Sequence, residues 1–434
     1  MILPEHLSIP RSRSYLPVPV VLSGQGEWEA GQILREVSTP VGKYLFGALR
    51  DVMLWLLLPP ARRKVAFVPG ALEVRLAQLG RSGASATLAQ HLTNLLRICY
   101  NDASQEEVGS WCLGVAEWAR AEGALRTELE FRQAAALSRP DEPVLSLSVA
   151  RLARDLSQHQ RAETWFRRSI KISRSQKNWT PYIRAYLGLG AMYGRLGNGP
   201  AARAVTERAL RAARRWRLRQ LAGEAHHDLF HILVDAGDLR HAYDHAESAE
   251  INYRGASVNL LARLAGDIAT LWVKIGASQR ARPILQSVIP LTDDPSLRAM
   301  WSAQLVRSTA FSDSVSEYDR VRAEALKDIE QATDLWRRAD ANLIIAWADL
   351  AMCAWDEAAN MAQTAFELAT SIGATEFIAY ADQAIRDARA HRREGSLFDS
   401  VEPPALSRVA DKVAGSILVA VERTRARRQA ADAS

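Results

Sequence analysis

Residues that favour a turn return along this 434-residue chain at a nearly constant spacing, and this period limits the possible folds more than any other feature. Between these positions, apolar residues follow the spacing of amphipathic helices. A fixed period near 40 residues predicts stacked helical hairpins, each of which buries its apolar face against its neighbours. The intervals are 34, 40, 40 and 39 residues, followed by a gap of 77 residues with room for two units; the positions are Gly123, Ser157, Gly197, Gly237, Gly276 and, after the gap, Cys353.

The clearest copy of the unit runs from Tyr186 to Arg214, where the sequence Gly197-Asn198-Gly199-Pro200 separates two helical patterns. It resembles the tetratricopeptide repeat (TPR), which pairs an aromatic residue, Leu-Gly and Tyr on its first helix with a turn Gly and two Ala on its second. The residues that match are Tyr186, Leu189, Gly190, Tyr193, Gly197, Ala202 and Ala209. The aromatic residue expected near Thr206 is missing. The resemblance covers roughly residues 105–393.

The period is longer than the usual TPR period of about 34 residues, so each unit has about one and a half extra helical turns. We expect these turns at the ends of the second helices, for example over Ala212–Leu218. One hairpin, over Pro295–Phe311 and Ser316–Arg337, has almost none of the family's residues. It is predicted only because the repeat period leaves room for a helix pair there.

We therefore predict an all-α fold, a TPR-like α-α superhelical solenoid of at least six helix pairs with a helical N-terminal cap and a C-terminal helix. Residues 1–70 hold two helices, Glu27–Val37 and Val41–Leu58, which form a cap or a docking element. The solenoid spans residues 71–393 and ends in a helix over Ala374–Arg393. Residues 394–434 contain a linker and a basic amphipathic helix, Ala405–Arg428.

The cysteine content and the apolar stretches indicate the cellular compartment of the protein. Three cysteines without a Cys-x-x-Cys pair favour reduced thiols, and no secretory signal opens the chain, so we expect a cytoplasmic protein. Lys43, Arg50 and Asp51 interrupt the apolar stretch Val41–Leu58, and the uninterrupted apolar run after Asp51 has only seven residues, too few to span a bilayer. We expect a buried helix there, with contact of Leu45–Leu58 with a membrane surface as the weaker alternative.

In the family that the chain resembles, the first helix of each pair faces a concave groove. Carrying this orientation over from the best repeat predicts a mostly basic groove with one acidic and histidine-containing patch. Its predicted partner-binding residues are Arg151, Arg154, Arg184, Arg195, Glu224, His227, His231, Arg263 and Lys274. Arginine forks match carboxylates, so the predicted partner is an acidic segment or a free carboxyl terminus. The alternative is a solvated face without a ligand.

Five of the nine histidines lie between residues 226 and 245, and His227 and His231 share a helix face. Two histidines with Glu224, Asp228 or Asp235 have the chemistry of a zinc site. No cysteine joins them, so we favour polar surface histidines and predict no metal and no cofactor, with His227 and His231 as the candidate ligands if a metal binds.

A second cluster is basic and lies on a second helix of the repeat. This basic flank consists of Arg208, Arg211, Arg214, Arg215, Arg217 and Arg219, and Arg167, Arg168 and Lys171 mark the same place one repeat earlier. It has the charge to hold phosphates or acidic segments. A nucleic-acid-binding helical repeat protein is therefore the alternative function.

No enzyme signature is present, since the chain has no Gly-rich phosphate loop, no His-Glu-x-x-His and no Gly-x-Ser-x-Gly. The predicted function is a non-enzymatic scaffold, adaptor or regulator that binds a protein or peptide. The long period also resembles the helical sensor domains of bacterial transcription regulators and peptide-pheromone receptors. Those usually carry a helix-turn-helix, which residues 1–70, with two helices, do not provide. The sequence leaves the oligomeric state open.

Overall fold

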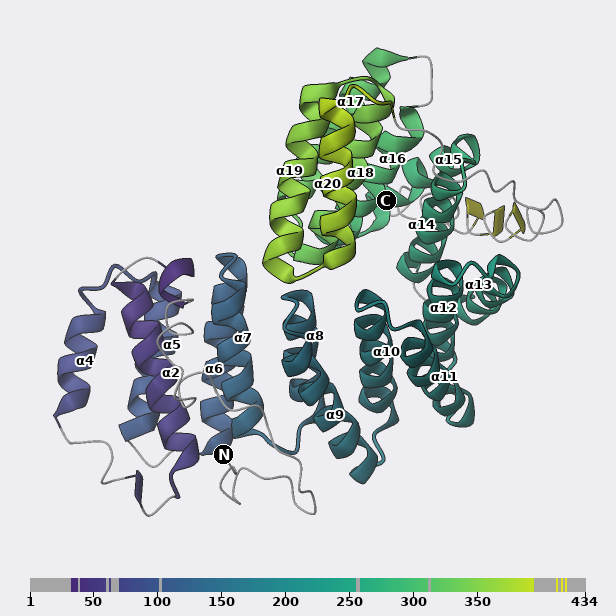
Figure 1. Cartoon of the computed structure of the whole chain (residues 1–434). Helices are drawn as coiled ribbons and strands as arrows, with labels where there is room; N and C mark the ends of the chain where they lie inside the picture. Colours follow the sequence, from purple (N-terminus) through teal and green to yellow (C-terminus); the bar gives the residue numbers. More distant parts are fainter. Residues whose placement is uncertain are drawn as a thin grey trace, which may run out of the picture. The chain divides into compact units, whose positions relative to one another are not determined.

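The computed structural model describes residues 33–37, 40–59, 62–63, 70–100, 104–254, 258–310 and 314–393, together with 411–412, 415–416 and 418–419. Within these ranges the regular structure is helical and no residue lies in a β-strand (Figure 1). The start of the predicted helix Glu27–Val37 lies outside the described residues. None of the described helices is both long and apolar enough to cross a membrane.

Seven consecutive helix pairs make up most of the described chain, which agrees with the prediction of at least six. They are α6 (Gln105–Ala121) with α7 (Leu125–Ser138), α8 (Pro143–Asp155) with α9 (His159–Ser175), α10 (Trp179–Arg195) with α11 (Gly199–Arg215), α12 (Arg219–Asp235) with α13 (Leu239–Tyr253), α14 (Val258–Lys274) with α15 (Ser278–Val288), α16 (Pro295–Thr309) with α17 (Val315–Glu330), and α18 (Leu335–Ala351) with α19 (Trp355–Ile372). The short 3₁₀ helix η3 (Ile289–Leu291) follows α15, and α20 (Thr375–Arg389) packs against α18 and α19 (Figure 1).

In six of the seven pairs, the turn between the two helices reverses the chain through one residue in the left-handed conformation. At the end of α10, the N–H of Asn198 donates to the carbonyl of Tyr193 at 2.9 Å, and Gly197 adopts a φ of 68°. Such a turn satisfies the last carbonyl groups of the helix, and glycine enters it without steric cost. All six turn positions predicted from the sequence have positive φ angles between 58° and 79°; they are Gly123, Ser157, Gly197, Gly237, Gly276 and Cys353.

The 40-residue period comes from long helices in both halves of the unit. Helices α10 and α11 each have 17 residues, and turns of three residues follow them. The extra length is therefore shared between the two helices, and the expectation that it lies at the end of the second helix is wrong. Two turns between repeats also contain a residue with positive φ, Lys177 after α9 and Arg217 after α11. These two residues are not among the turn positions predicted from the sequence.

The close helix crossing expected at Gly190 is present. A Cβ atom at this position would lie 2.3 Å from Oγ1 of Thr206 and 3.6 Å from the carbonyl oxygen of Ala202. Thr206 thus occupies the space of the missing aromatic residue, and its smaller side chain allows α10 and α11 to approach closely.

The hairpin placed by periodicity alone is present with different ends. Helix α17 ends at Glu330, not Arg337, and a new helix begins at Leu335. The reason is Asp334, whose side chain accepts hydrogen bonds from the N–H groups of Trp336 (3.1 Å) and Arg337 (3.4 Å). This cap satisfies amide groups that otherwise have no partner at a helix start.

Before the pairs, the described residues include the helices α2 (Val41–Leu57), α4 (Ala71–Leu79) and α5 (Ala86–Tyr100). Helix α2 packs against α5 and α7, and Leu45, Val52 and Leu56 are fully buried. Asp51, which interrupts the apolar stretch, is buried and forms an ion pair with Arg75 of α4. The stretch is thus a packed helix of the protein interior.

Hydrogen bonds between residues far apart in the sequence connect the N-terminal segment to α7 of the first helix pair. The carboxylate of Glu36 accepts hydrogen bonds from the N–H groups of Arg126 (2.9 Å) and Thr127 (2.8 Å) at the start of α7. A carboxylate at this position also interacts favourably with the helix dipole. These contacts are what a cap requires, and the domain boundaries at residues 70 and 393 stay predictions.

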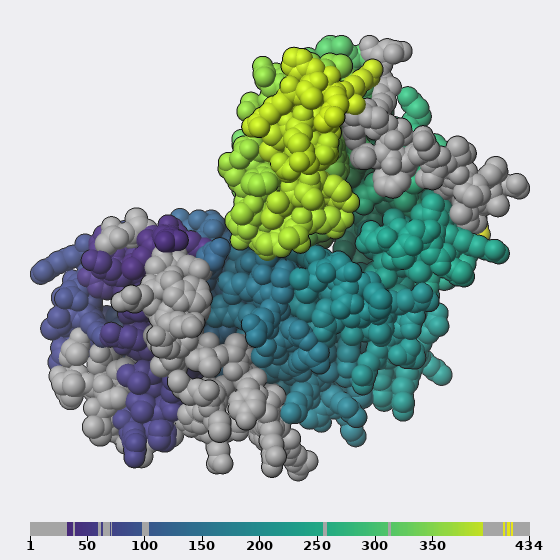
Figure 2. All heavy atoms as spheres, viewed as in Figure 1, coloured from purple at the N-terminus to yellow at the C-terminus, as the bar shows by residue number. Residues whose placement is uncertain are grey.

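Two compact units divide the chain, Met1–Leu189 (unit 1) and Gly190–Ser434 (unit 2), and the division falls within α10. The helices α19 and α20 form a continuous yellow-green surface of unit 2 in Figure 2. The predicted C-terminal helix 405–428 lies mostly outside the described residues. Its described part contacts α13, since Lys412 pairs with Glu247 at 2.5 Å and Ser416 donates to Glu250 at 2.7 Å.

Candidate functional site

The predicted groove residues belong to two units. Arg151, Arg154 and Arg184 lie in unit 1, on the first helices α8 and α10, and the other six lie in unit 2. Arg151 is exposed and Arg184 is half-buried, and Arg184 has no ion-pair partner among the described residues. Arg154 already binds the carboxylate of Asp155, at 2.8 and 3.0 Å.

Arg195 differs from the sequence-based expectation. Its guanidinium forms an ion pair with Asp334, the cap of α18, and lies over the ring of Trp336 at 5.2 Å from the centroid. The side chains of both ion-pair partners are about nine-tenths buried, at 10% and 9% exposure. Arg195 therefore contributes to the packing of unit 2, and its carboxylate partner is a residue of this chain.

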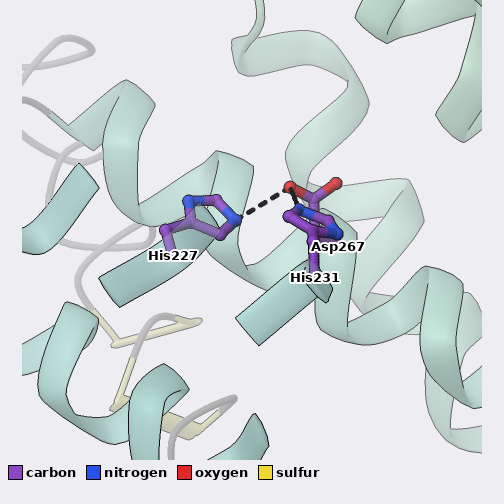
Figure 3. Close-up of side chains that lie close together, drawn as sticks. All are labelled: His227, His231 and Asp267. Carbon is purple, nitrogen blue, oxygen red and sulfur yellow. Dashed lines mark hydrogen bonds and ion pairs between the residues drawn. The ribbon is translucent and has the colours of Figure 1, made fainter. Parts of the chain in front are cut away.

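The histidine patch is organised around a carboxylate from the next first helix. Nε2 of His227 lies 2.9 Å and Nε2 of His231 lies 3.0 Å from the same oxygen, Oδ2 of Asp267 (Figure 3). The two imidazoles stack, with ring centroids 5.2 Å apart. The two histidines come from successive turns of α12, and Asp267 comes from α14. The cluster thus joins two first helices of neighbouring repeats.

The protonation states within this cluster differ from one residue to the next. Burial lowers the pKa of His227 to about 4, although the hydrogen bond with Asp267 acts in the opposite direction. Burial also opposes the charge on His231, but the carboxylates of Asp267 and Asp235 outweigh it and raise the pKa of this histidine. Burial would raise the pKa of Asp267, yet the two imidazoles hold it well below its usual range. At neutral pH, His227 is therefore neutral and Asp267 is ionised.

The sequence placed His227 and His231 together but did not identify their partner. It offered Glu224, Asp228 and Asp235 as further ligands, all from α12, whereas the structure brings in Asp267 from 40 residues further along the chain. The sequence signal that could have identified Asp267 is its position about one repeat after His227. Glu224 instead accepts a hydrogen bond from Gln220 at 3.2 Å.

The other histidines of the patch form separate contacts. Nδ1 of His226 lies 2.8 Å from Nδ1 of His245, and its Nε2 lies 3.0 Å from the guanidinium of Arg214. His226 is buried at the position that corresponds to Tyr186 in the best repeat. His227 is also buried, so the expectation of polar surface histidines is wrong for that residue. His241 is exposed and bonds to Asp238, the N-cap residue of the same helix α13.

A second perturbed carboxylate lies on the first helix α18. Burial raises the pKa of Asp340 to about 6. The negative charges of Glu376 and Asp235 also raise it, whereas the positive charges of Lys274 and Arg307 lower it. Lys274, Arg307 and Asp235 come from the first helices α14, α16 and α12, and Glu376 comes from α20. Four successive first helices of unit 2 thus contribute charges to one region.

Replacing Asp340 with Asn is expected to stabilise the protein above pH 6. Because the folded-state pKa of about 6 exceeds the ordinary value of 3.8, the unfolded chain releases its proton first as the pH rises. The wild type therefore loses stability relative to Asp340→Asn between about pH 4 and pH 7, by at most about 3 kcal/mol. Solvent screening at this half-buried position reduces the effect to about 1–2 kcal/mol.

Urea unfolding of both proteins across this pH range measures the difference. The exposed Asp319→Asn on α17 is the control and should leave the pH profile unchanged. Parallel profiles for wild type and Asp340→Asn would contradict the burial of this carboxylate.

The basic flank is a surface feature of α11 and the start of α12. All six of its arginines are exposed. Arg211 pairs with Glu207 at 3.7 Å, and Arg214 contacts His226. One repeat earlier, Arg168 was predicted on the surface, but it is buried and lies over the ring of Trp165. Burial lowers the pKa of its guanidinium to about 9.

No protein-family model and no curated protein sequence matches the chain, but solved structures do. The crystal structure of a Rap protein complexed with Competence and Sporulation Factor is similar at 11% identity with a TM-score of 0.50, over 76% of this chain and 99% of that chain.

Two further solved structures match with lower scores. A signal-transduction ATPase with a tetratricopeptide repeat sensor from Pyrococcus horikoshii is 10% identical with a TM-score of 0.46, over 91% of this chain and 64% of that one. Aspartyl phosphate phosphatase F from Bacillus subtilis is 12% identical with a TM-score of 0.38, over 87% and 92% of the two chains. Together with the helix pairs and their left-handed turns, the likeness to the Rap protein shows that the chain has an all-α, TPR-like helical repeat fold.

Proposed function

We propose that this protein is a cytoplasmic, non-enzymatic regulator or adaptor that binds a protein or peptide segment on the faces of its first helices. The fold supports the proposal, because helical repeats present extended surfaces to partners. A Rap protein with this fold was solved as a complex with Competence and Sporulation Factor.

The observation that carries the proposal is the charge arrangement around Asp340. A half-buried carboxylate with a pKa of about 6 lies among charges from α12, α14, α16 and α20. Within a helical repeat, packing alone does not require such a group, and perturbed pKa values cluster at functional sites. We therefore place this region within the surface that a partner segment contacts.

The partner segment is proposed to be acidic or to end in a free carboxylate. Arg151 and Arg184 lie on successive first helices of unit 1 and are the proposed contacts for this segment. Arg263 of unit 2, which is exposed beside the histidine patch, is a separate candidate. Arg154 and Arg195 are left out of this role because their side chains are only 19% and 10% exposed. Guanidinium groups bind carboxylates through two parallel hydrogen bonds, which favours them over other cations for this task.

Reversing two charges tests this specificity. The double variant Arg151→Glu/Arg184→Glu is expected to weaken the binding of short acidic peptides by at least about tenfold, since one charge-assisted hydrogen bond contributes roughly 1.5–3 kcal/mol. Fluorescence anisotropy with labelled acidic, neutral and basic peptides measures the change. The matched control is Arg208→Glu/Arg211→Glu on the basic flank, which changes the net charge equally. Equal binding by the double variant and the wild type would show that these arginines do not hold the partner.

Nucleic-acid binding is the second candidate, supported by the exposure of all six arginines of the basic flank. Binding through phosphates would fall steeply with salt concentration. In that case Arg208→Glu/Arg211→Glu would abolish a salt-sensitive mobility shift of a generic duplex, and Arg151→Glu/Arg184→Glu would leave it unchanged.

A further inference from the structure

We propose that His227, His231 and Asp267 form a binding site for a divalent transition-metal ion, of which Zn²⁺ is the representative. The three side chains offer two imidazole nitrogens and one carboxylate oxygen, the ligand types that zinc takes from proteins. The two histidines lie one helical turn apart on α12, so their rings face the same direction. Asp267 of α14 closes the set from the neighbouring repeat (Figure 3).

The distances between the three ligand atoms suit a shared ion. Oδ2 of Asp267 lies 2.9 Å from one Nε2 and 3.0 Å from the other, and all three atoms are within 4.8 Å of one another. Ligand atoms around a tetrahedral zinc lie about 3.4 Å apart, given bonds of about 2.0–2.2 Å. The two nitrogen–oxygen distances need to widen by only about 0.5 Å, which small side-chain rotations provide.

Contacts outside the three ligands hold two of them in position. Nε1 of Trp301, on α16, donates to Oδ1 of Asp267 at 3.4 Å, so Oδ2 remains the oxygen that faces the histidines. The hydroxyl of Tyr253, on α13, lies 3.5 Å from Nδ1 of His227 and can accept its proton-bearing N–H when Nε2 binds an ion. Metal-binding histidines and carboxylates in proteins commonly have such outer partners, which orient them.

The site also has an open side through which an ion can enter. The side chain of His227 is 5% exposed and that of Asp267 is 13% exposed, whereas that of His231 is 47% exposed. Three protein ligands leave at least one coordination position to water or to a group of a partner. An ion bound here would connect α12 to α14 and place a positive charge on the faces of the first helices.

Zinc binding by the full-length chain tests the site directly. The protein is prepared without a histidine tag, stripped of metal with a chelator and titrated with ZnCl₂ in a calorimeter. We expect one strong Zn²⁺ site per chain and a rise in melting temperature on binding. Titration with Co²⁺ is expected to give visible absorption bands typical of an ion with few ligands, bound through nitrogen and oxygen. This measurement uses the wild-type protein alone.

Matched substitutions locate the ion. His231→Ala removes a half-exposed ligand, and His241→Ala removes an exposed histidine of the next helix that is outside the cluster. We expect the first to weaken Zn²⁺ binding by at least about tenfold and the second to leave it unchanged. Asp267→Asn keeps the shape of the ligand and should also weaken binding, while Trp301→Phe should weaken it about tenfold through loss of the outer hydrogen bond.

Two results would overturn the proposal. The wild type binding no Zn²⁺ would mean that the three residues form only a hydrogen-bonded link between α12 and α14. Equal Zn²⁺ affinity of His231→Ala and wild type would place the ion elsewhere. Because Zn²⁺ alone is the probe, either result leaves the proposed peptide binding untouched.

Discussion

Arg322→Met is expected to lower the free energy of unfolding by about 3–5 kcal/mol, because it leaves a buried carboxylate without its counter-charge. Asp349 of α18 is fully buried and receives two hydrogen bonds from the guanidinium of Arg322 on α17, at 2.7 and 2.9 Å. The hydroxyl of Tyr318 donates a third, at 2.5 Å. Burial raises the pKa of Asp349 even with these partners in place, and once Arg322 is removed only the hydrogen bond from Tyr318 remains of the three. Urea unfolding at neutral pH measures the loss.

Arg320→Met, on the same helix, is the matched control. Arg320 pairs with Glu324, and both side chains are well exposed, so its loss is expected to cost about 0–1 kcal/mol. Combining Arg322→Met with Asp349→Leu and Tyr318→Phe should recover most of the stability, since buried ion pairs can be replaced by apolar residues of similar volume. Similar effects of Arg320→Met and Arg322→Met would contradict the burial of the pair.

Gly190→Leu is expected to destabilise unit 2 by about 1–3 kcal/mol or more, through overpacking at the crossing of α10 and α11. Even a single Cβ atom would lie 2.3 Å from Oγ1 of Thr206, which is shorter than a contact between these atoms allows. Thr206 is fully buried and β-branched, so it has little freedom to move away. A lowered melting temperature and urea midpoint would report the effect.

The same helix provides a control one turn further on. A Cβ atom at Gly194 has no neighbour within 4 Å, so Gly194→Leu is expected to be neutral or slightly stabilising through better helix propensity. Thr206→Ala removes the obstructing oxygen, which has no hydrogen-bond partner among the described residues, and should partly rescue Gly190→Ala. If Gly190→Leu and Gly194→Leu unfold at the same urea concentration, the crossing is not tight.

The metal proposal and the peptide proposal can succeed or fail separately. Zinc binding depends on His231 and Asp267, whereas capture of an acidic peptide is assigned to Arg151 and Arg184. Measuring peptide binding with and without Zn²⁺ then shows whether the ion contributes to partner recognition. Tighter binding of acidic peptides in the presence of Zn²⁺ is expected if a partner carboxylate fills the open coordination position.

The sequence by itself determined the helix pairs and their turns. These depend on local chemistry: the spacing of apolar residues sets each helix, and a residue in the left-handed conformation ends it. For this reason Gly197 and even Cys353, which is not a glycine, could be assigned as turns from their positions in the period, and both have positive φ. Gly190 was likewise identifiable, because a small residue at a helix crossing has a recognisable place in the repeat.

Only the tertiary structure decided which polar groups face one another. The sequence named His227 and His231 but not Asp267, and it placed Arg195 in a groove where the structure pairs it with Asp334, 139 residues further along the chain. The physical reason is that charged side chains interact across the packing of distant helices, over a few ångströms and in specific directions. Helical periodicity predicts which face of a helix a residue occupies. Which residue of a neighbouring helix it contacts depends on how the repeats stack.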